Sequence, residues 1–144
     1  MTTDAFNTRH ERPNDRRIVI VGPCASGKTT LADTLRARGL DASVCGQEHS
    51  DIPTLWNHTR PDIVIGLTVS LAALRERRGA DWPDALYRRQ LERLSNAFAI
   101  ADLLIDTTTT GPDAAVETGI ARVLSRPGPN GRSADVLPES RHQR

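Results

Sequence analysis

The chain has 144 residues, which is enough for a single domain with a modest apolar core. Its formal net charge of +1 gives no electrostatic reason to expect nucleic acid or an anionic membrane as a partner. No apolar run approaches the ~20 residues of a membrane span, and the polar amino terminus has no signal-peptide core, so we expect a cytoplasmic protein. Cys24 and Cys45 are too few and too far apart to indicate a disulfide framework or a zinc site.

A strand, a glycine-containing loop and a helix follow a polar lead-in. Residues 1–16 are mixed in charge and lack an apolar period, which predicts a disordered segment. The apolar run Arg17-Ile18-Val19-Ile20-Val21 predicts a buried parallel strand, and residues 30–38 predict a helix that ends at Gly39. Between them, Gly22-Pro23-Cys24-Ala25-Ser26-Gly27-Lys28-Thr29 fits the pattern G-x-x-x-x-G-K-S/T of a phosphate-binding loop.

The residue types in this loop suit a polyphosphate. Two glycines let the backbone approach a phosphate without a Cβ in the way, and successive N–H groups then point at the anion beside the positive end of the next helix. Lys28 would reach the β- and γ-phosphates, and the Thr29 hydroxyl would complete the shell of a Mg²⁺ ion. Because Lys28 is the only lysine, an Asn/Thr-Lys-x-Asp guanine-reading motif is impossible, which favours adenine. The predicted ATP-binding residues of this segment are Gly22, Cys24, Ala25, Ser26, Gly27, Lys28, Thr29 and Thr30.

Four elements are predicted between residues 40 and 79. Residues 40–45 predict a second strand, and residues 62–67 predict a third, buried strand. Between these strands, the polar residues 47–51 lead into a short helix with apolar or small side chains at helical spacing: Ile52, Leu55, Trp56 and Thr59. Ser70 then caps a helix that runs to Gly79.

The remainder of the chain predicts two helices, a strand and a tail. Residues 81–83 start a longer helix with an apolar stripe: Tyr87, Leu91, Leu94 and Phe98. Residues 103–106 predict the last strand, and residues 107–111 predict a threonine-rich loop. A final helix opens at Pro112 and turns four apolar side chains inward: Val116, Ile120, Val123 and Leu124. Residues 126–144 are rich in proline and glycine and predict a disordered tail.

Strands that alternate with helices predict a three-layer α/β/α fold over residues 17–125, with a short parallel sheet of about four strands. Together with the phosphate-binding loop pattern after the first strand, this indicates a P-loop NTPase fold. In such sheets ligands bind beyond the carboxyl ends of the strands. Asp62 lies at the opposite end of its strand, so we expect a solvated or capping residue. Glu48 lies at the correct edge and could hold a Mg²⁺ ion or accept a proton from a substrate, the alternative being a polar loop that only turns the chain. Asp106 shares this edge, ahead of the threonine-rich loop.

Arginines gather in two groups that flank a glycine: Arg75, Arg77 and Arg78, then Arg88, Arg89 and Arg93. Guanidinium groups on a mobile segment stabilise the charge that phosphoryl transfer spreads over the equatorial oxygens, and residues 79–81 could form the hinge of such a lid. The alternative is a solvated helix face with pairs such as Arg88 and Glu92. For Cys24 the alternatives are a small filler side chain and a thiol whose modification blocks nucleotide binding.

The chain resembles the small P-loop kinases of the shikimate, gluconate and nucleoside/nucleotide kinase type. The resemblance rests on residues 22–29, on Val64-Ile65-Gly66-Leu67-Thr68-Val69-Ser70 ahead of Arg75, and on Arg93 nine residues before Asp102. It implies that Arg93 contacts the phosphoryl acceptor and that the loop from Thr107 to Gly111 lies near the base. These kinases usually have five parallel strands and paired acids after the second strand, whereas this sequence predicts four strands and has Gln47-Glu48-His49 there.

The sequence therefore predicts an ATP-dependent phosphotransferase that acts on a small molecule as a monomer or homodimer. The predicted catalytic residues are Lys28, Glu48, Arg75, Arg78 and Arg93, with Thr29 and Glu48 at the Mg²⁺ ion and Thr107 at the nucleotide. The alternative is a nucleotide-binding regulatory module that is non-catalytic or hydrolyses ATP only weakly.

Overall fold

The computed structural model describes residues 15–125, so the predicted disordered segments lie almost entirely outside the described residues. Four strands form one all-parallel sheet: β1 Arg17–Val21, β2 Asp41–Val44, β3 Ile63–Thr68 and β4 Leu103–Asp106. Their order is β2-β1-β3-β4, with Ile18 beside Ile63 and Ile65 beside Leu103. The prediction of a short parallel sheet of four strands is confirmed.

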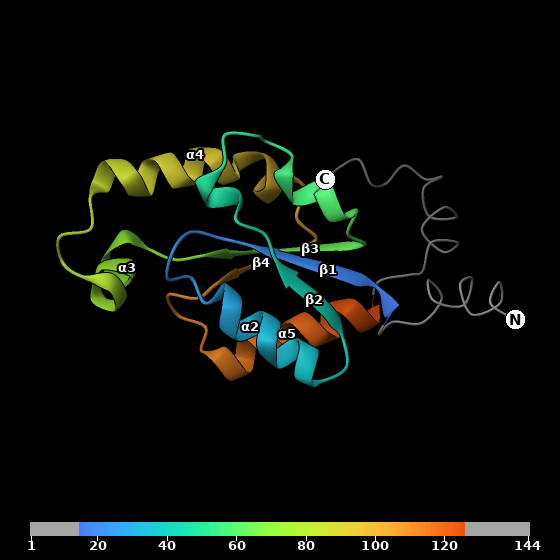
Figure 1. Cartoon of the computed structure of the whole chain (residues 1–144). Coiled ribbons are helices and arrows are strands. Elements are labelled where there is room, and N and C mark those ends of the chain that lie inside the picture. Colours follow the sequence, from blue (N-terminus) through green and yellow to red (C-terminus); the bar gives the residue numbers. More distant parts are fainter. Residues whose placement is uncertain (1–14, 126–144) are drawn as a thin grey trace, which may run out of the picture.

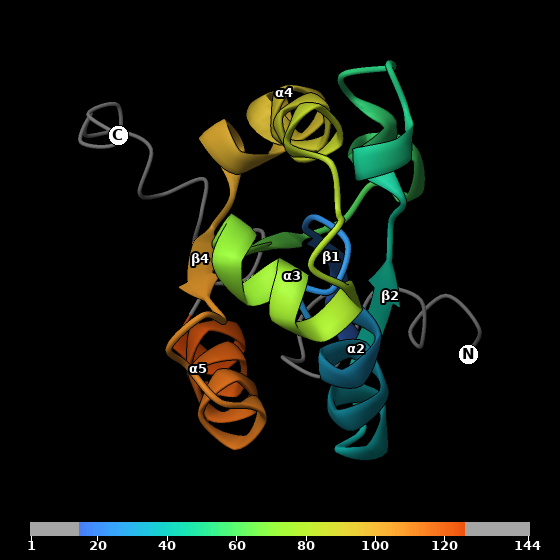
Figure 2. The same ribbon diagram turned by 90° about the vertical axis from the view of Figure 1, so that its left-hand side faces the viewer.

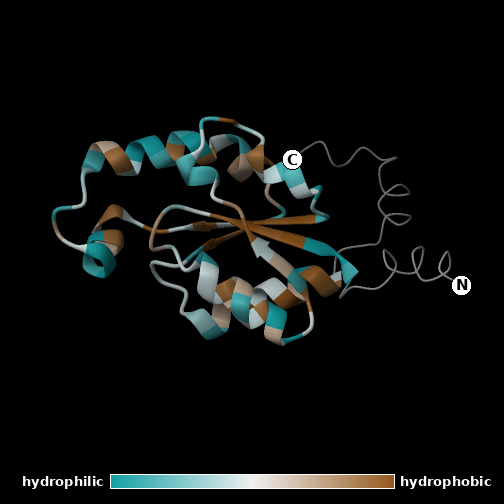
Figure 3. Ribbon diagram, in the orientation of Figure 1, coloured by the Kyte–Doolittle hydropathy of each residue, from teal (hydrophilic) through white to brown (hydrophobic). Residues whose placement is uncertain are grey.

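Four α-helices complete the described mixed α/β domain: α2 Lys28–Ala37, α3 Leu71–Arg78, α4 Asp84–Ile100 and α5 Pro112–Ser125. Figure 1 shows α2 and α5 on one face of the sheet and α4 on the other, so the sheet lies between two helical layers. Because both faces are covered, the central strands β1 and β3 are almost continuously apolar, whereas the edge strand β2 contains Asp41 and Ser43. Figure 3 shows the contrast between the hydrophobic central strands and the largely hydrophilic α4. Within residues 15–125, none of the helices has both the length and the apolar character needed to cross a membrane.

Alternate side chains of the strands enter two separate cores. Toward α2 and α5 the core consists mainly of branched aliphatic side chains, among them Ile18, Ile20, Ile63, Ile65, Leu31, Leu35 and Val116. Toward α4 it is smaller and contains Val19, Val21, Val64, Leu94 and Ala97. This alternation fixes the sheet between its helices, because a shift of one residue would exchange the two sets of side chains.

Helix α3 lies at the carboxyl edge of the sheet and not over either face. The Ser70 side chain caps it by accepting the N–H of Ala73 at 3.0 Å, as predicted. Its buried residues Ala73 and Leu74 pack in a cluster that includes Ala25. Figure 2 looks onto this edge of the sheet and shows α3 in front of β1. The helix therefore covers the loop that follows β1.

The short helix predicted after residues 47–51 is confirmed only in part. The structure has a 3-10 helix there, η3 Leu55–Thr59, which follows a shorter one, η2 Gln47–His49, and Ile52 between them is 59% exposed. The buried side chain of Gln47 explains the difference, because its Nε2 donates to the Ile52 carbonyl at 2.7 Å and its Oε1 accepts from the Trp56 N–H at 2.9 Å. These bonds hold the backbone groups of the segment in an irregular path.

Two further details correct the predictions at the ends of the domain. Leu124, predicted to face inward, is 62% exposed, and the buried face of α5 instead includes Ala115 and Gly119 beside Val116 and Val123. Arg16, assigned to the disordered lead-in, is buried, and its Nη1 donates to the Val123 carbonyl at 2.8 Å. Arg16 therefore packs as part of the described domain.

Candidate functional site

The loop of residues 22–29, here called the glycine loop, connects the carboxyl end of β1 to α2. Ala25 and Gly27 have positive φ angles of 63° and 96°, and the Ser26 N–H donates to the Pro23 carbonyl at 3.2 Å. At Gly22 a Cβ would lie 2.6 Å from the Ser26 Oγ and 2.9 Å from the Leu67 carbonyl, so a side chain cannot fit there. The loop thus curls tightly against β3.

Helix α2 begins at Lys28, two residues before the predicted start. Its N-cap is Gly27, and within the described residues no side chain caps the helix or places an acid in its first turn. The first N–H groups of a helix have no partner inside the helix and carry a partial positive charge. The start of α2 therefore presents N–H groups and positive potential beside the glycine loop.

Lys28 folds back over the glycine loop. Its ammonium group donates to the Gly22 carbonyl at 2.9 Å and to the Pro23 carbonyl at 3.1 Å. It also forms an ion pair with the Oε2 atom of Glu48 at 2.8 Å, and the two side chains are only 10% and 5% exposed. A buried cation and a buried carboxylate thus compensate each other at the carboxyl edge of the sheet.

Glu48 reaches this position from η2, just after β2. Its second oxygen, Oε1, is buried and has no hydrogen-bond partner among residues 15–125. Asp62 lies at the opposite edge, where its Oδ2 accepts the Arg17 N–H at 2.9 Å, so of the two expected roles, solvated or capping, it has the capping one. The structure brings Glu48, and not Asp62, to the glycine loop.

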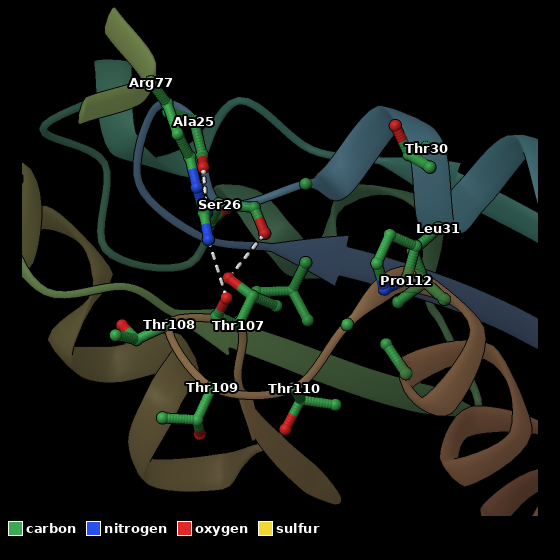
Figure 4. A pocket seen from close by; sticks show the side chains of 14 residues that line it. Ala25, Ser26, Thr30, Leu31, Arg77, Thr107, Thr108, Thr109, Thr110 and Pro112 are labelled. Atoms are coloured by element: carbon green, nitrogen blue, oxygen red, sulfur yellow. Dashed lines mark hydrogen bonds between the residues drawn. The ribbon is translucent and has the colours of Figure 1, made fainter. Parts of the chain in front are cut away.

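The glycine loop lines two cavities, and each of them has a volume of about 420 Å³. The first cavity, here called the threonine pocket, is shown in Figure 4. It is lined by the glycine loop, by the threonine-rich loop of residues 107–111 and by the starts of α2 and α5, including Ser26, Gly27, Thr30, Arg77, Thr107, Thr110 and Pro112. The lysine pocket is lined by residues from the glycine loop, η2 and α3, including Cys24, Lys28, Thr29, Glu48, His49 and Arg78. The residues that the sequence predicted for one nucleotide site are therefore distributed over two pockets.

The walls of the threonine pocket are tied together by Arg77 and Thr107 (Figure 4). Arg77 donates from Nη1 to the Ala25 carbonyl and from Nη2 to the Thr107 carbonyl, both at 2.7 Å. The Thr107 hydroxyl lies 2.9 Å from the Ser26 carbonyl. The sequence indicated Arg77 only as one of a group of arginines, because the carbonyls that it reaches depend on how α3 packs against the glycine loop.

The other predicted arginines have different partners. Arg75 donates from Nε and Nη2 to the Trp82 carbonyl at 3.0 and 2.8 Å, so the structure uses it to hold the connection between α3 and α4. Arg78 lies over the Trp82 ring at 5.7 Å and also lines the lysine pocket. Arg93 donates to the Glu48 carbonyl at 3.3 Å and to Asp51 at 2.8 Å. Its hydrogen bond and charge hold the pKa of the Asp51 carboxyl below its usual value.

Gln90 is a residue of the site that the sequence did not indicate. It is buried in α4, accepts the Cys24 N–H at 3.0 Å and donates from Nε2 to the Cys24 Sγ at 3.2 Å. An amide in the apolar face of a helix could have been noticed as an interruption of the stripe, because a buried amide needs partners. Gln90 fixes the glycine loop to α4.

The described residues thus form an α/β domain with a glycine loop between two pockets at the carboxyl edge of a parallel sheet. No protein-family model matches the chain, and no curated protein matches it.

Proposed function

We propose that the protein binds ATP with Mg²⁺ at the glycine loop and transfers the γ-phosphoryl group to a small-molecule acceptor. The observation that carries this proposal is the environment of Lys28: an ammonium group over a loop of the G-x-x-x-x-G-K-S/T pattern, beside the uncapped start of α2. Backbone N–H groups, a helix start and an ammonium group are together the complement of a polyphosphate.

The two pockets support a division of roles. The threonine pocket suits the base side of the nucleotide, because its lining combines Leu31, Leu67 and Ala115 with threonine hydroxyls. The lysine pocket suits the terminal phosphates and the acceptor, since it holds Lys28 and Arg78 as cations and Glu48 as a carboxylate. Arg77 donates to the Ala25 and Thr107 carbonyls and so ties the glycine loop to the threonine-rich loop.

Phosphate binding would exchange the partner of Lys28. The ammonium group would leave Glu48 for the β- and γ-phosphate oxygens, and the Glu48 carboxylate would lose its ion pair with Lys28. Glu48 and the Thr29 hydroxyl, which line the same pocket, would then hold Mg²⁺, which neutralises phosphate charge when bound. The buried Oε1 atom of Glu48 fits this role because it has no partner within residues 15–125. Arg78 would stabilise charge on the transferred group, and Arg93 fixes the Glu48 backbone at the acceptor side.

A nucleotide-binding module without turnover is the second candidate. Two observations favour it: Arg75 and Arg93 are engaged by the Trp82 carbonyl and by Asp51, and Glu48 is the only carboxylate among the residues lining the lysine pocket. Such a protein would bind ATP equally well but lack the groups that activate an acceptor.

Calorimetry with MgATP tests whether the site exists. Glu48→Gln, which replaces one of the two proposed Mg²⁺ ligands, should weaken binding, and the double variant Lys28→Met/Glu48→Gln, which leaves no unpaired charge, should lose it. The matched control is Asp62→Asn at the opposite sheet edge, which should bind like the wild type. Absence of binding heat for the folded wild type would overturn both candidate functions.

A panel of acceptors then separates the two candidates. ADP release is followed with MgATP and sugars, polyol acids or nucleosides, one class at a time. Release that depends on one acceptor class supports the phosphotransferase. Tight ATP binding with no ADP release across the panel contradicts the phosphotransferase and supports the regulatory module.

A further inference from the structure

The lysine pocket also brings together three side chains that are common metal ligands. Cys24 of the glycine loop and Glu48 and His49 of η2 each offer one ligand atom, and these atoms all lie within 4.8 Å of one another. The His49 Nε2 lies 3.9 Å from the Cys24 Sγ and 3.4 Å from the Glu48 Oε2. Because Cys24 is 24 residues away from Glu48, only the fold creates this cluster.

The geometry distinguishes a metal site from a nucleophilic triad. In a Cys-His-acid triad the acid binds one ring nitrogen of the histidine and the nucleophile faces the other. Here a single nitrogen of His49, Nε2, faces both the sulfur and the carboxylate. Three ligand atoms that converge on one volume are the arrangement of a coordination site.

Two independent features support a bound cation at this point. The Glu48 Oε1 atom is buried without a hydrogen-bond partner within residues 15–125, although its side chain is only 5% exposed, which is costly for a carboxylate oxygen. The buried Gln90 donates its Nε2 hydrogen to the Cys24 Sγ at 3.2 Å. A donor to the sulfur fixes its orientation toward the cluster, as supporting residues around metal ligands do.

We propose that Cys24, Glu48 and His49 bind one divalent cation of the zinc class, with the fourth position open to the lysine pocket. Zinc–ligand bonds of ~2.3 Å to sulfur and ~2.0 Å to nitrogen at a tetrahedral angle place these two atoms about 3.5 Å apart. The observed separation is 3.9 Å, and the His49 side chain is 64% exposed, so its ring can move the remaining distance. Thiolate and imidazole ligands select Zn²⁺ and Co²⁺ over Mg²⁺.

This site goes beyond the proposed ATP site and is tested without nucleotide. The untagged full chain is titrated with Co²⁺, whose thiolate complexes have a charge-transfer band in the near ultraviolet and whose tetrahedral sites have intense visible bands. We expect one equivalent of Co²⁺ to bind and to produce both the charge-transfer band and the visible bands. One equivalent of Zn²⁺ should abolish these bands, and excess Mg²⁺ should leave them unchanged.

Matched variants assign the ligands. Cys24→Ser should remove the charge-transfer band, whereas Cys45→Ser, at the other cysteine of the chain, should keep it. His49→Gln should weaken Co²⁺ binding at least tenfold, since even supporting residues of metal sites contribute about 10–100-fold. The control His58→Gln lies on η3, outside the cluster, and should bind like the wild type. His49 is exposed, so its substitution tests the site without disturbing the core.

Three results would overturn the proposal: no charge-transfer band in the folded wild type, an unchanged band in Cys24→Ser, or unchanged Co²⁺ affinity in His49→Gln. None of them bears on ATP binding, which is measured by calorimetry with MgATP. Failure of the metal site and failure of the nucleotide site are therefore distinguishable.

Discussion

Removal of the Lys28 ammonium should destabilise the protein even without any ligand. In Lys28→Met the Glu48 carboxylate, which is 5% exposed, would lose its ion-pair partner inside the fold. Breaking a buried pair from one side costs about 3–5 kcal/mol, because an uncompensated charge stays buried. The free energy of unfolding of small domains is about 5–15 kcal/mol, so this loss is a large fraction of it.

A double-mutant cycle separates the ion pair from the other contacts of Lys28. Glu48→Gln keeps the shape of the side chain and should cost less than Lys28→Met. In the double variant no charge is left unpaired, so its loss should be smaller than the sum of the single losses by about 1–3 kcal/mol. The matched control is Arg38→Met, which breaks an exposed ion pair with Glu117 and should cost less than about 1 kcal/mol.

Urea unfolding followed by tryptophan fluorescence measures these differences. Trp56 reports on the contact between η3 and α4, where its Nε1 donates to Asn96 at 2.8 Å, and Trp82 reports on the end of α3. With a slope of about 1–3 kcal/mol per molar urea, the midpoint of Lys28→Met should fall by at least about 1 M. A midpoint equal to that of Arg38→Met would refute the buried ion pair.

Three further outcomes follow from single sites. Gly66→Ala should cost about 1–3 kcal/mol in urea unfolding, because a Cβ there would lie 2.6 Å from a side-chain atom, whereas Gly46→Ala has open space and should be neutral. The ion pair with Arg93 lowers the pKa of Asp51, so its stabilisation is present above pH ~4 and is lost as the pH falls through the lowered pKa. Asp51→Asn should therefore lose less Tm than the wild type between about pH 5 and pH 3. Burial raises the pKa of the Cys45 thiol, so its alkylation, mapped by mass spectrometry, should reach half-maximal rate above pH ~8.5.

Local sequence patterns were sufficient for most of the sheet and its helices. The boundaries of β1 and β4 match the predicted strands, since short apolar runs between polar residues leave few alternatives. The segment from 47 to 59 was predicted only in part, because the Gln47 side chain takes up backbone groups of Ile52 and Trp56 within the same segment. Spacing of apolar residues carries no information about such a side chain.

The site was predictable where a motif or a sheet edge decided it. The rule that ligands lie at the carboxyl edge of a parallel sheet correctly predicted that Glu48 lies beside the glycine loop and that Asp62 lies at the opposite edge. The partners of the arginines were not predictable, because a long flexible side chain can reach many carbonyls and its choice depends on tertiary packing. Arg75 holds the Trp82 carbonyl, while Arg77 holds the glycine loop.

The buried Glu48 carboxylate links the two proposals. The fold already keeps Lys28 away from water at 10% exposure, so exchange of a carboxylate for a phosphate requires little new desolvation of the lysine. The same carboxylate cannot neutralise Lys28, hold Mg²⁺ beside a nucleotide and complete the Cys24–His49 ligand set at once. A zinc-class cation at Cys24 and His49 would withdraw Glu48 from the proposed Mg²⁺ site and add positive charge beside Lys28. Occupancy of the two sites should therefore be coupled through this one residue, by the same factor in both directions.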